Sequence, residues 1–492
     1  MNGSIIRYIL GQILKLEGIF MLVPTITGAI YGEKEALIYL GVGAFCSLFG
    51  FMIARKKPSN DVFYLKEGCV ATALSWIFLS IFGAMPMFIS GEIPSYIDAL
   101  FETVSGFTTT GASILSDVES LSHASLLWRS FTHWIGGMGV LVFLLAIIPM
   151  TGGSHMNLMK AESPGPSVGK LVPKVKHTAR ILYLIYMGMT ALEFILLICG
   201  KMSPFEALNA AFGTAGTGGF SFKNDGFASY SPYIQWVVTI FMILFGVNFN
   251  AYYLIIFGNF RKALKMEEVR TYFIIILVAT GIIFAQLVKT STSTFKAITD
   301  AAFHVGSIMT STGYSAADFN TWPQTSRAIL VVLMFIGACA GSTGGGIKVS
   351  RIIILVKSIK KELTSYIHPK SISKIHMEGK PVEHEVIRAT NVYMITFMVI
   401  FVVSTLLLSI EGKDLVTTFT ATIATLNNIG PGLEMVGPTA NFGHFNNFSK
   451  VILTLNMLIG RLELFPLLIL FHPTLWKDMI TQNIRRRRNT SK

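Results

Sequence analysis

The chain has 492 residues, of which 52% are hydrophobic and 14% are charged, and its formal net charge is +13 at pH 7. Soluble domains carry about 25% charged residues, so this composition excludes an ordinary soluble enzyme and indicates an integral membrane protein. No basic domain with interleaved aromatic residues accompanies the positive charge, which disfavours a nucleic-acid partner.

Apolar runs long enough to cross a bilayer recur along the whole chain. A hydrocarbon core about 30 Å thick needs about 20 apolar residues per helix. Runs of this length predict ten spans, at residues 8–30, 36–54, 69–90, 128–149, 181–200, 235–257, 271–289, 327–347, 391–410 and 451–472. Because ten is an even number, both termini are expected on the same side of the membrane.

The distribution of Lys and Arg predicts which side this is. One set of connecting segments holds 28 Lys and Arg against 10 Asp and Glu, and comprises residues 55–67, 151–180, 258–270, 348–388 and 477–492. The segments on the other side hold only 6 basic against 12 acidic residues. Cytoplasmic loops carry the excess of Lys and Arg, so we expect both termini in the cytoplasm. The tail Arg485–Arg488 is part of this signal and a candidate contact for anionic membrane lipid.

Four segments on the acidic side share one pattern. In each of them, a semi-apolar stretch of helical periodicity, too short to span, precedes a tract of small polar residues centred on a glycine. The central glycines are Gly111, Gly218, Gly313 and Gly430, and every copy lies between two predicted spans. The pattern predicts an all-α integral membrane protein with four tandem repeats of helix, pore loop and helix. We expect two extra N-terminal transmembrane helices at 1–60 and repeats at 61–160, 161–265, 266–365 and 366–492.

Non-helical backbone at membrane depth is tolerated only where it is buried in protein or lines a water-filled cavity. Four such loops around one axis would present backbone carbonyls that can replace the hydration shell of a small cation. The short helices would also direct their partially negative C-terminal ends toward the same point. For a single loop, simple re-entrant packing of small residues remains the alternative. Four copies in register with the spans favour a cation pathway.

Sequence stretches in every repeat resemble those of one known family of membrane proteins. The chain resembles bacterial Trk-type potassium uptake proteins, in the TrkH/TrkG branch of the TrkH–KtrB superfamily. The matching stretches are FETVSGFTTTGAS (101–113), WRSFTHWIGGMGVLV (128–142), NAAFGTAGTGGFS (209–221), TSTGYSAADF (310–319), GACAGSTGGGIKVSR (337–351), ATLNNIGPG (424–432) and GRLELFP (460–466). The family fold consists of four joined copies of the potassium-channel unit, with one pore in each protomer of a homodimer.

The resemblance implies that the residues at and just before each central glycine supply the filter for the transported K⁺. Here these are Thr109, Thr110 and Gly111; Gly216, Thr217 and Gly218; Ser311, Thr312 and Gly313; and Asn428, Ile429 and Gly430. The four loops differ from one another and from the TVGYG filter of potassium channels. We therefore expect one well-formed carbonyl ring, or two, and looser discrimination between K⁺ and Na⁺.

A second glycine cluster, residues 341–346, interrupts the predicted span at 327–347. Adjacent glycines break a helix, since each disfavours it by about 1 kcal/mol relative to alanine. A phosphate-binding loop is excluded by spacing, because Ile347 separates Gly346 from Lys348. The resemblance implies an intramembrane loop that obstructs the pore, and tight helix packing is the alternative. The glycines assigned to this gate are Gly341, Gly344, Gly345 and Gly346.

Two basic residues complete the predicted gate. Arg461 lies inside the last apolar run, and intramembrane charge is costly and marks function by default. In the family, this arginine projects toward the pore as an electrostatic barrier below the filter; a structural ion pair with Glu463 is the alternative. Lys348 is either a second gate charge or the first positive residue on the cytoplasmic side.

These observations predict K⁺ uptake across a bacterial plasma membrane through a gated, channel-like pore rather than an enzymatic activity. The sequence contains no HExxH motif. We expect no organic cofactor in this chain, and the resemblance implies a peripheral cytoplasmic nucleotide-binding subunit of the TrkA type. The alternative is a secondary carrier coupled to Na⁺ or H⁺, although such carriers commonly show two inverted halves. The sequence leaves open whether the membrane potential alone or ion symport drives uptake.

Overall fold

The computed structural model describes residues 2–58, 64–139, 175–370, 374–475 and 477, and this part of the chain is almost entirely helical. Three N-terminal helices, α1 (Gly3–Phe20), α2 (Leu22–Tyr31) and α3 (Glu35–Ala54), precede all the others. Glycines let α1 and α3 approach closely, because a Cβ on Gly50 would lie 2.6 Å from the carbonyl oxygen of Gly11. Small residues at such crossings are typical of packed membrane helices.

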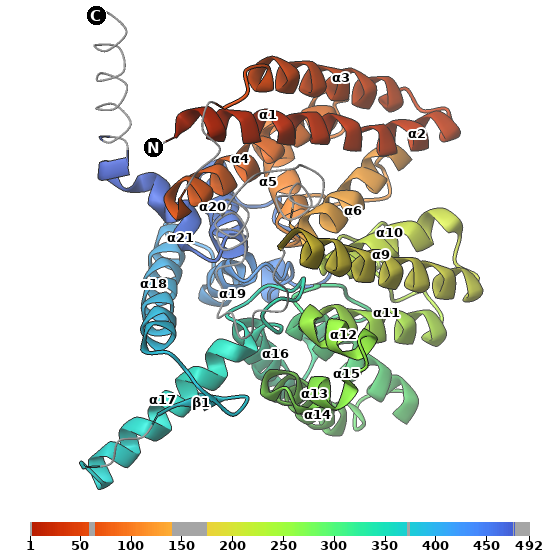
Figure 1. Cartoon of the computed structure of the whole chain (residues 1–492). Helices are drawn as coiled ribbons and strands as arrows, with labels where there is room; N and C mark the ends of the chain where they lie inside the picture. Colours follow the sequence, from red (N-terminus) through yellow and green to blue (C-terminus); the bar gives the residue numbers. More distant parts are fainter. Residues whose placement is uncertain (1, 59–63, 140–174, 371–373, 476, 478–492) are drawn as a thin grey trace, which may run out of the picture.

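The rest of the chain alternates long helices with short ones. The long helices that open each group are α4 (Leu65–Ile89), α9 (Val175–Cys199), α14 (Glu267–Leu287) and α18 (His384–Ser409). The short helices that follow them are α5 (Tyr96–Phe107), α10 (Pro204–Gly216), α15 (Thr294–Met309) and α19 (Leu415–Leu426). Each group closes with a further helix: α6 (His123–Gly137), α11 (Pro232–Phe245), α16 (Gln324–Ile336) or α20 (Asn447–Arg461). The four groups follow one another around the centre of the molecule in chain order (Figure 1).

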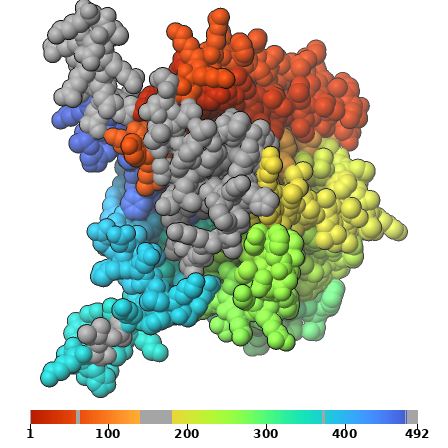
Figure 2. Space-filling view, in the orientation of Figure 1, coloured from red at the N-terminus to blue at the C-terminus, as the bar shows by residue number. Residues whose placement is uncertain are grey.

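Smaller elements connect these groups. They are the helices α12 (Phe249–Ile256), α13 (Phe260–Lys265), α17 (Val349–Ile367) and α21 (Phe465–Leu468), the 3-10 turns Phe319–Thr321, Glu434–Val436 and Ile469–Phe471, and the hairpin of β1 (His376–Met377) and β2 (Lys380–Pro381). Helix α17 projects from the body of the protein as an arm (Figures 1 and 2).

Among the described residues, six helices are long and apolar enough to cross a membrane, or eight when each of two bent pairs counts as one span. The prediction of several membrane-crossing helices is confirmed, whereas the spans predicted at 235–257 and 451–472 are each a bent pair of helices rather than one continuous helix. The predicted span at 235–257 bends by 92° between α11 and α12, where Asn248 caps the second helix through the N–H of Asn250. The span at 451–472 bends by 119° between α20 and the segment 465–471.

The helix in one other predicted span, at 327–347, is shorter than the apolar run, and part of another span lies outside the described residues. The run at 327–347 is helical only to Ile336, because the glycine cluster that follows leaves the helical conformation. In the run at 128–149, α6 ends at Gly137, and residues 140–149 lie outside the described part of the chain. The sequence thus indicated the break at the glycine cluster, whereas it did not indicate the bends within 235–257 and 451–472.

The short helices begin at residues that favour helix starts. The side chains of the N-cap residues Ser95, Ser203, Ser293 and Asp414 each accept a hydrogen bond from a backbone N–H in the first turn. Such caps satisfy donors that a helix N-terminus otherwise leaves free. From these capped ends, each short helix enters the protein interior, where its last turn is buried.

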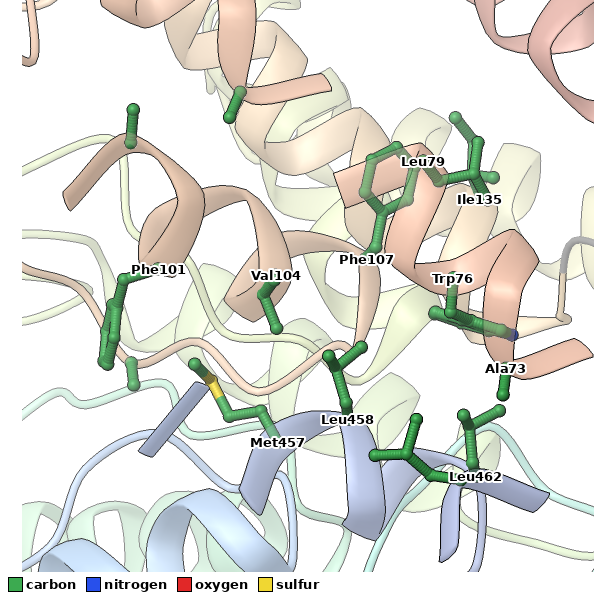
Figure 3. Packing of buried hydrophobic residues seen from close by; sticks show 14 of the residues in the cluster. Ala73, Trp76, Leu79, Phe101, Val104, Phe107, Ile135, Met457, Leu458 and Leu462 are labelled. Carbon is green, nitrogen blue, oxygen red and sulfur yellow. The ribbon is translucent and has the colours of Figure 1, made fainter. Parts of the chain in front are cut away.

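The first and fourth groups pack on each other through aromatic and aliphatic side chains. Figure 3 shows Trp76 and Leu79 of α4, Phe107 of α5 and Met457 and Leu458 of α20 in one buried cluster. Transfer of each large apolar side chain from water to the interior contributes about 1.5–3 kcal/mol to the free energy of folding. Close packing in the interior keeps the position of each side chain defined. This cluster holds the end of α5 in position against α4 and α20.

Candidate functional site

All four short helices end in the same backbone motif. In each, a residue with left-handed backbone follows the helix, and the N–H of the next residue donates to the carbonyl five positions earlier, over 2.8–2.9 Å. This is a Schellman ending, which normally has glycine at the left-handed position. Here that position holds Thr109, Thr217, Ser311 and Asn428, with φ between 53° and 57°. Non-glycine residues in this conformation are uncommon and cluster at functional sites.

Two residues further on, every loop has a glycine with positive φ. These glycines are Gly111, Gly219, Gly313 and Gly430, with φ of 78°, 77°, 84° and 95°. The prediction that Gly218 is central in the second loop is therefore wrong by one residue, and the residues before the glycine are Thr217 and Gly218 rather than Gly216 and Thr217. The sequence has two successive glycines here, and the helix ending, rather than composition, decides which of them matches Gly111.

The four loops contact each other in a closed ring. Each positive-φ glycine faces a backbone carbonyl oxygen of the next loop, so closely that an added Cβ would clash with it. The facing pairs are Gly111 with Gly218, Gly219 with Thr312, Gly313 with Ile429, and Gly430 with Thr110. Only glycine allows both this backbone conformation and this approach. The order of the contacts, from the first loop through the fourth and back to the first, encloses a central axis.

The ring carries carbonyl oxygens that the described protein does not use. Within the described chain, no hydrogen-bond donor reaches the carbonyl oxygens of the residues before the glycines, which are Thr110, Gly218, Thr312 and Ile429. Buried backbone carbonyls are almost always paired with protein, water or a ligand. The partially negative C-terminal ends of four helices meet at the same place. The arrangement therefore favours a dehydrated cation.

Side chains behind the ring hold the loops together. His133 is fully buried; its Nδ1 lies 2.8 Å from the carbonyl oxygen of Gly106, and its Nε2 accepts from the N–H of Phe220 at 3.2 Å. It thus links the first loop to the second. The amide of Asn428 donates to the hydroxyl of Thr110 over 2.9 Å and links the fourth loop to the first.

A buried ion pair that the sequence did not reveal adds a second link between the first two loops. The carboxylate of Glu102 accepts from Arg129 Nε at 2.9 Å and from the N–H of Ile114 at 3.0 Å, and it is fully buried. Arg129 also donates to the carbonyl oxygen of Ser221. Charged residues are rarely fully buried unless paired, so Glu102 is a structural residue here and not a solvated acid.

The glycine cluster 341–346 lies next to this ring, where the third and fourth short helices end. The N–H of Gly345 donates to the hydroxyl of Ser311, and the N–H of Gly346 donates to the carbonyl oxygen of Asn427 over 3.1 Å. A Cβ on Gly344 would lie 2.6 Å from the carbonyl oxygen of Thr310, so the backbone itself fills this space. The loop therefore touches the bases of the third and fourth filter loops.

Both predicted gate charges contact this loop or its surroundings. Lys348 is buried, has a φ of 83°, and donates through Nζ to the carbonyl oxygen of Gly344. Arg461 donates to the carbonyl oxygen of Thr343 over 3.0 Å, and also to those of Gly136 and Gly137 at the end of α6. The guanidinium thus links the glycine loop to the C-terminal end of α6.

Glu463 has a different partner from the one considered in the sequence. Its carboxylate forms a buried ion pair with Arg351 in the first turn of α17. The alternative of a structural pair between Arg461 and Glu463 is therefore not favoured. The bend after α20 turns Glu463 toward α17, because Glu463 and Leu464 both have positive φ.

No cluster of three or more His, Cys, Asp or Glu side chains suited to a metal ion occurs among the described residues. The ring of carbonyls and the Arg461-linked loop are therefore the strongest candidate site, and neither would be found by a search for acidic or imidazole ligands.

Comparison with known proteins identifies the family to which the chain belongs. The profile of the TrkH family, described as cation transport protein, matches residues 40–483. The Trk system potassium uptake protein TrkH of Escherichia coli is 34% identical over 490 residues, which cover 97% of this chain and all of the relative. TrkG of the same organism is 31% identical, with the same coverage. The crystal structure of the potassium transporter TrkH from Vibrio parahaemolyticus superposes with a TM-score of 0.86 at 31% identity, covering 97% of this chain and all of that chain. The resemblance is thus confirmed, and the chain belongs to the TrkH family of cation transport proteins.

Proposed function

We propose that this protein takes up K⁺ through a channel-like pore formed by four tandem repeats of helix, pore loop and helix. The observation that carries the proposal is the closed ring of four Schellman endings, each followed by a glycine that faces the next loop. Backbone carbonyls arranged around one axis replace the hydration shell of a cation without a charged ligand. The names of the relatives, which are potassium uptake proteins, supply K⁺ as the ion.

The filter comprises two levels. Carbonyls of Thr110, Gly218, Thr312 and Ile429 form the first level, and those of the left-handed residues Thr109, Thr217, Ser311 and Asn428 form the second. The central glycines Gly111, Gly219, Gly313 and Gly430 hold the loops at contact distance. The four loops are chemically different, which limits how many equivalent carbonyl rings they can build.

The gate consists of the glycine loop 341–346, Lys348 and Arg461. Hydrogen bonds from Gly345 and Gly346 seat the loop below the filter, and Arg461 ties it to α6. The fixed positive charge of Arg461 below the filter also opposes a cation that leaves the filter. Opening requires that the loop and Arg461 move away from the axis.

We further propose a plasma-membrane location with both termini in the cytoplasm and two N-terminal transmembrane spans outside the four repeats, the first formed by α1 and α2 together (Gly3–Tyr31) and the second by α3. The Lys and Arg distribution supports this orientation. Assembly as a homodimer and regulation by a nucleotide-binding subunit of the TrkA type rest on the family resemblance. The repeat boundaries at 61–160, 161–265, 266–365 and 366–492 also remain predictions.

The test of the proposed function is ⁸⁶Rb⁺ or K⁺ flux into proteoliposomes that contain only this chain, under a diffusion potential and without a pH gradient. Gly111→Ser is compared with Gly91→Ser, a matched control whose φ of 79° equals that of Gly111 within one degree but whose Cβ would meet no atom within 4 Å. Both variants place a side chain at the same positive φ, and only Gly111→Ser introduces a Cβ that clashes with a carbonyl oxygen of the neighbouring loop.

We expect flux that follows the potential and prefers K⁺, with the preference lost in Gly111→Ser and kept in Gly91→Ser. Flux that needs a proton or sodium gradient and is unaffected by Gly111→Ser would instead place the protein among secondary carriers.

A further inference from the structure

A buried carboxylate, that of Glu268, lies beside the glycine loop, and neither the sequence pattern nor the filter explains it. Glu268 lies in the first turn of α14, is 3% exposed and contacts neither the filter loops nor Arg461 through any hydrogen bond of the described residues. Its neighbour Glu267 is partly exposed and pairs with Lys357 on the surface. A buried carboxylate needs strong partners, so those of Glu268 indicate its role.

The carboxylate of Glu268 binds both ends of the glycine loop. Oε1 accepts from the N–H of Ala340 over 2.7 Å and from the N–H of Ser350 over 3.2 Å. Ala340 directly precedes Gly341, and Ser350 lies in the first turn of α17, which follows the loop. One carboxylate oxygen of Glu268 therefore binds the backbone on both sides of the 341–346 segment.

The same carboxylate also fixes the loop to the bend between α11 and α12. Oε2 accepts from the side-chain amide of Asn248 over 3.2 Å, and the N–H of Phe249 donates to the carbonyl oxygen of Gly341 over 2.9 Å. Asn248 is the residue that caps α12. Glu268 thus joins three elements, α12, α14 and α17, at the two points where the loop begins and ends.

We propose that Glu268 is the positioning residue of the gate, which holds both ends of the glycine loop so that only the segment between them moves. The proposal rests on the proposed function for its consequence in transport. The loop itself is rich in glycine, and glycine loses more conformational freedom on ordering than any other residue. Without fixed ends, the closed arrangement against Ser311 and Asn427 would compete with many open ones.

The first test measures the loop directly. Cys339 is fully buried and lies next to Ala340, so its reaction with a charged methanethiosulfonate reagent reports release of this end of the loop. The other three cysteines, Cys46, Cys69 and Cys199, are replaced by alanine. We expect labelling in Glu268→Gln to be about tenfold faster or more, as for loss of a charge-assisted hydrogen bond. Glu267→Gln is the matched control and should label as slowly as the parent protein.

A second variant guards against general misfolding of Glu268→Gln. Ser350→Pro removes the N–H donor together with the hydroxyl and places proline in the first helical turn, where it is tolerated. Ser350→Ala removes the hydroxyl alone and keeps the N–H, so the difference between the two variants reports the N–H. We expect faster labelling in Ser350→Pro and not in Ser350→Ala. The effects of Glu268→Gln and Ser350→Pro should be less than additive in the double variant, because both weaken the contact between Glu268 and the N–H of Ser350.

The same proteins are then assayed for K⁺ flux in proteoliposomes. Raised basal flux in Glu268→Gln and Ser350→Pro supports the role of the anchor in gating. Slow labelling in Glu268→Gln, equal to that in Glu267→Gln, overturns the anchor whatever the flux. Fast labelling of Glu268→Gln, combined with no K⁺ flux in the parent protein or in any variant, retains the anchor and refutes the proposed function.

Discussion

At the scale of single residues, Arg461 is a clear case in which a charged group in an apolar segment has defined partners. Its guanidinium reaches the carbonyl oxygens of Thr343 in the glycine loop and of Gly136 and Gly137 at the end of α6. The last carbonyls of a helix have no partner within the helix, and cations are favoured at this end. The planar guanidinium serves two elements at once, which a lysine ammonium does not do with the same geometry.

Replacement of Arg461 by alanine is expected to increase basal K⁺ flux by about tenfold or more, since hydrogen bonds to a charged group contribute about 1.5–3 kcal/mol each. Arg461→Lys should give an intermediate increase, because it keeps the charge but loses the fork. Flux into proteoliposomes at a fixed potential measures both. Arg270→Ala, at an exposed position of α14, is the control. Unchanged flux in Arg461→Ala would exclude the gate role.

At the scale of elements, two ion pairs join α17 to other described parts of the chain, and they differ in burial. The pair of Arg351 with Glu463 has side chains 5% and 12% exposed, and joins α17 to the bend that follows Arg461. The pair of Lys357 with Glu267 is 31% and 28% exposed. Arg351 also lies over the ring of Tyr393, with 4.0 Å between the guanidinium carbon and the ring centre. The buried pair therefore couples the helix that continues the glycine loop to the helix that carries Arg461.

Breaking the buried pair on one side leaves a buried charge, which costs about 3–5 kcal/mol, whereas removing both charges is tolerated better. We expect Arg351→Gln and Glu463→Gln each to lower the thermal unfolding temperature in detergent more than the double variant does. The same cycle with Lys357→Gln and Glu267→Gln should show little coupling, because exposed pairs contribute only about 0–1 kcal/mol. Additive effects at the buried pair would contradict this coupling.

At the scale of the whole molecule, the four loops share a backbone but differ in side chains. Thr, Thr, Ser and Asn occupy the left-handed position, and Thr, Gly, Thr and Ile follow them. Their supports differ as well, since His133 joins the first two loops whereas Asn428 joins the fourth to the first. A ring with unequal supports is less able to hold four carbonyls at equal distances from an ion.

We therefore expect measurable Na⁺ permeation in addition to K⁺ permeation. Bi-ionic measurements on proteoliposomes or a planar bilayer, with K⁺ on one side and Na⁺ on the other, determine the ratio. Na⁺ permeation below detection would show that the unequal loops nevertheless form a stringent filter.

Much of this arrangement followed from sequence patterns that depend on local physics. Apolar runs identified the membrane helices, and four glycine-centred tracts identified the loops, because glycine is required wherever the backbone must turn tightly against another chain segment. The glycine cluster and Arg461 were also recognisable, since both are unfavourable in an apolar span without a function.

Tertiary structure alone decided the register of the second loop, the bends at 246–248 and 462–464, and the partners of the charged residues. Gly218 and Gly219 are equivalent in composition, and only the helix ending selects Gly219. Glu102, Glu268 and Glu463 find partners 27, 72 and 112 positions away in the chain, at Arg129, Ala340 and Arg351. A local pattern determines which backbone conformations are accessible, whereas the pairing of buried polar groups depends on which distant segments meet, and that is fixed only when the helices pack.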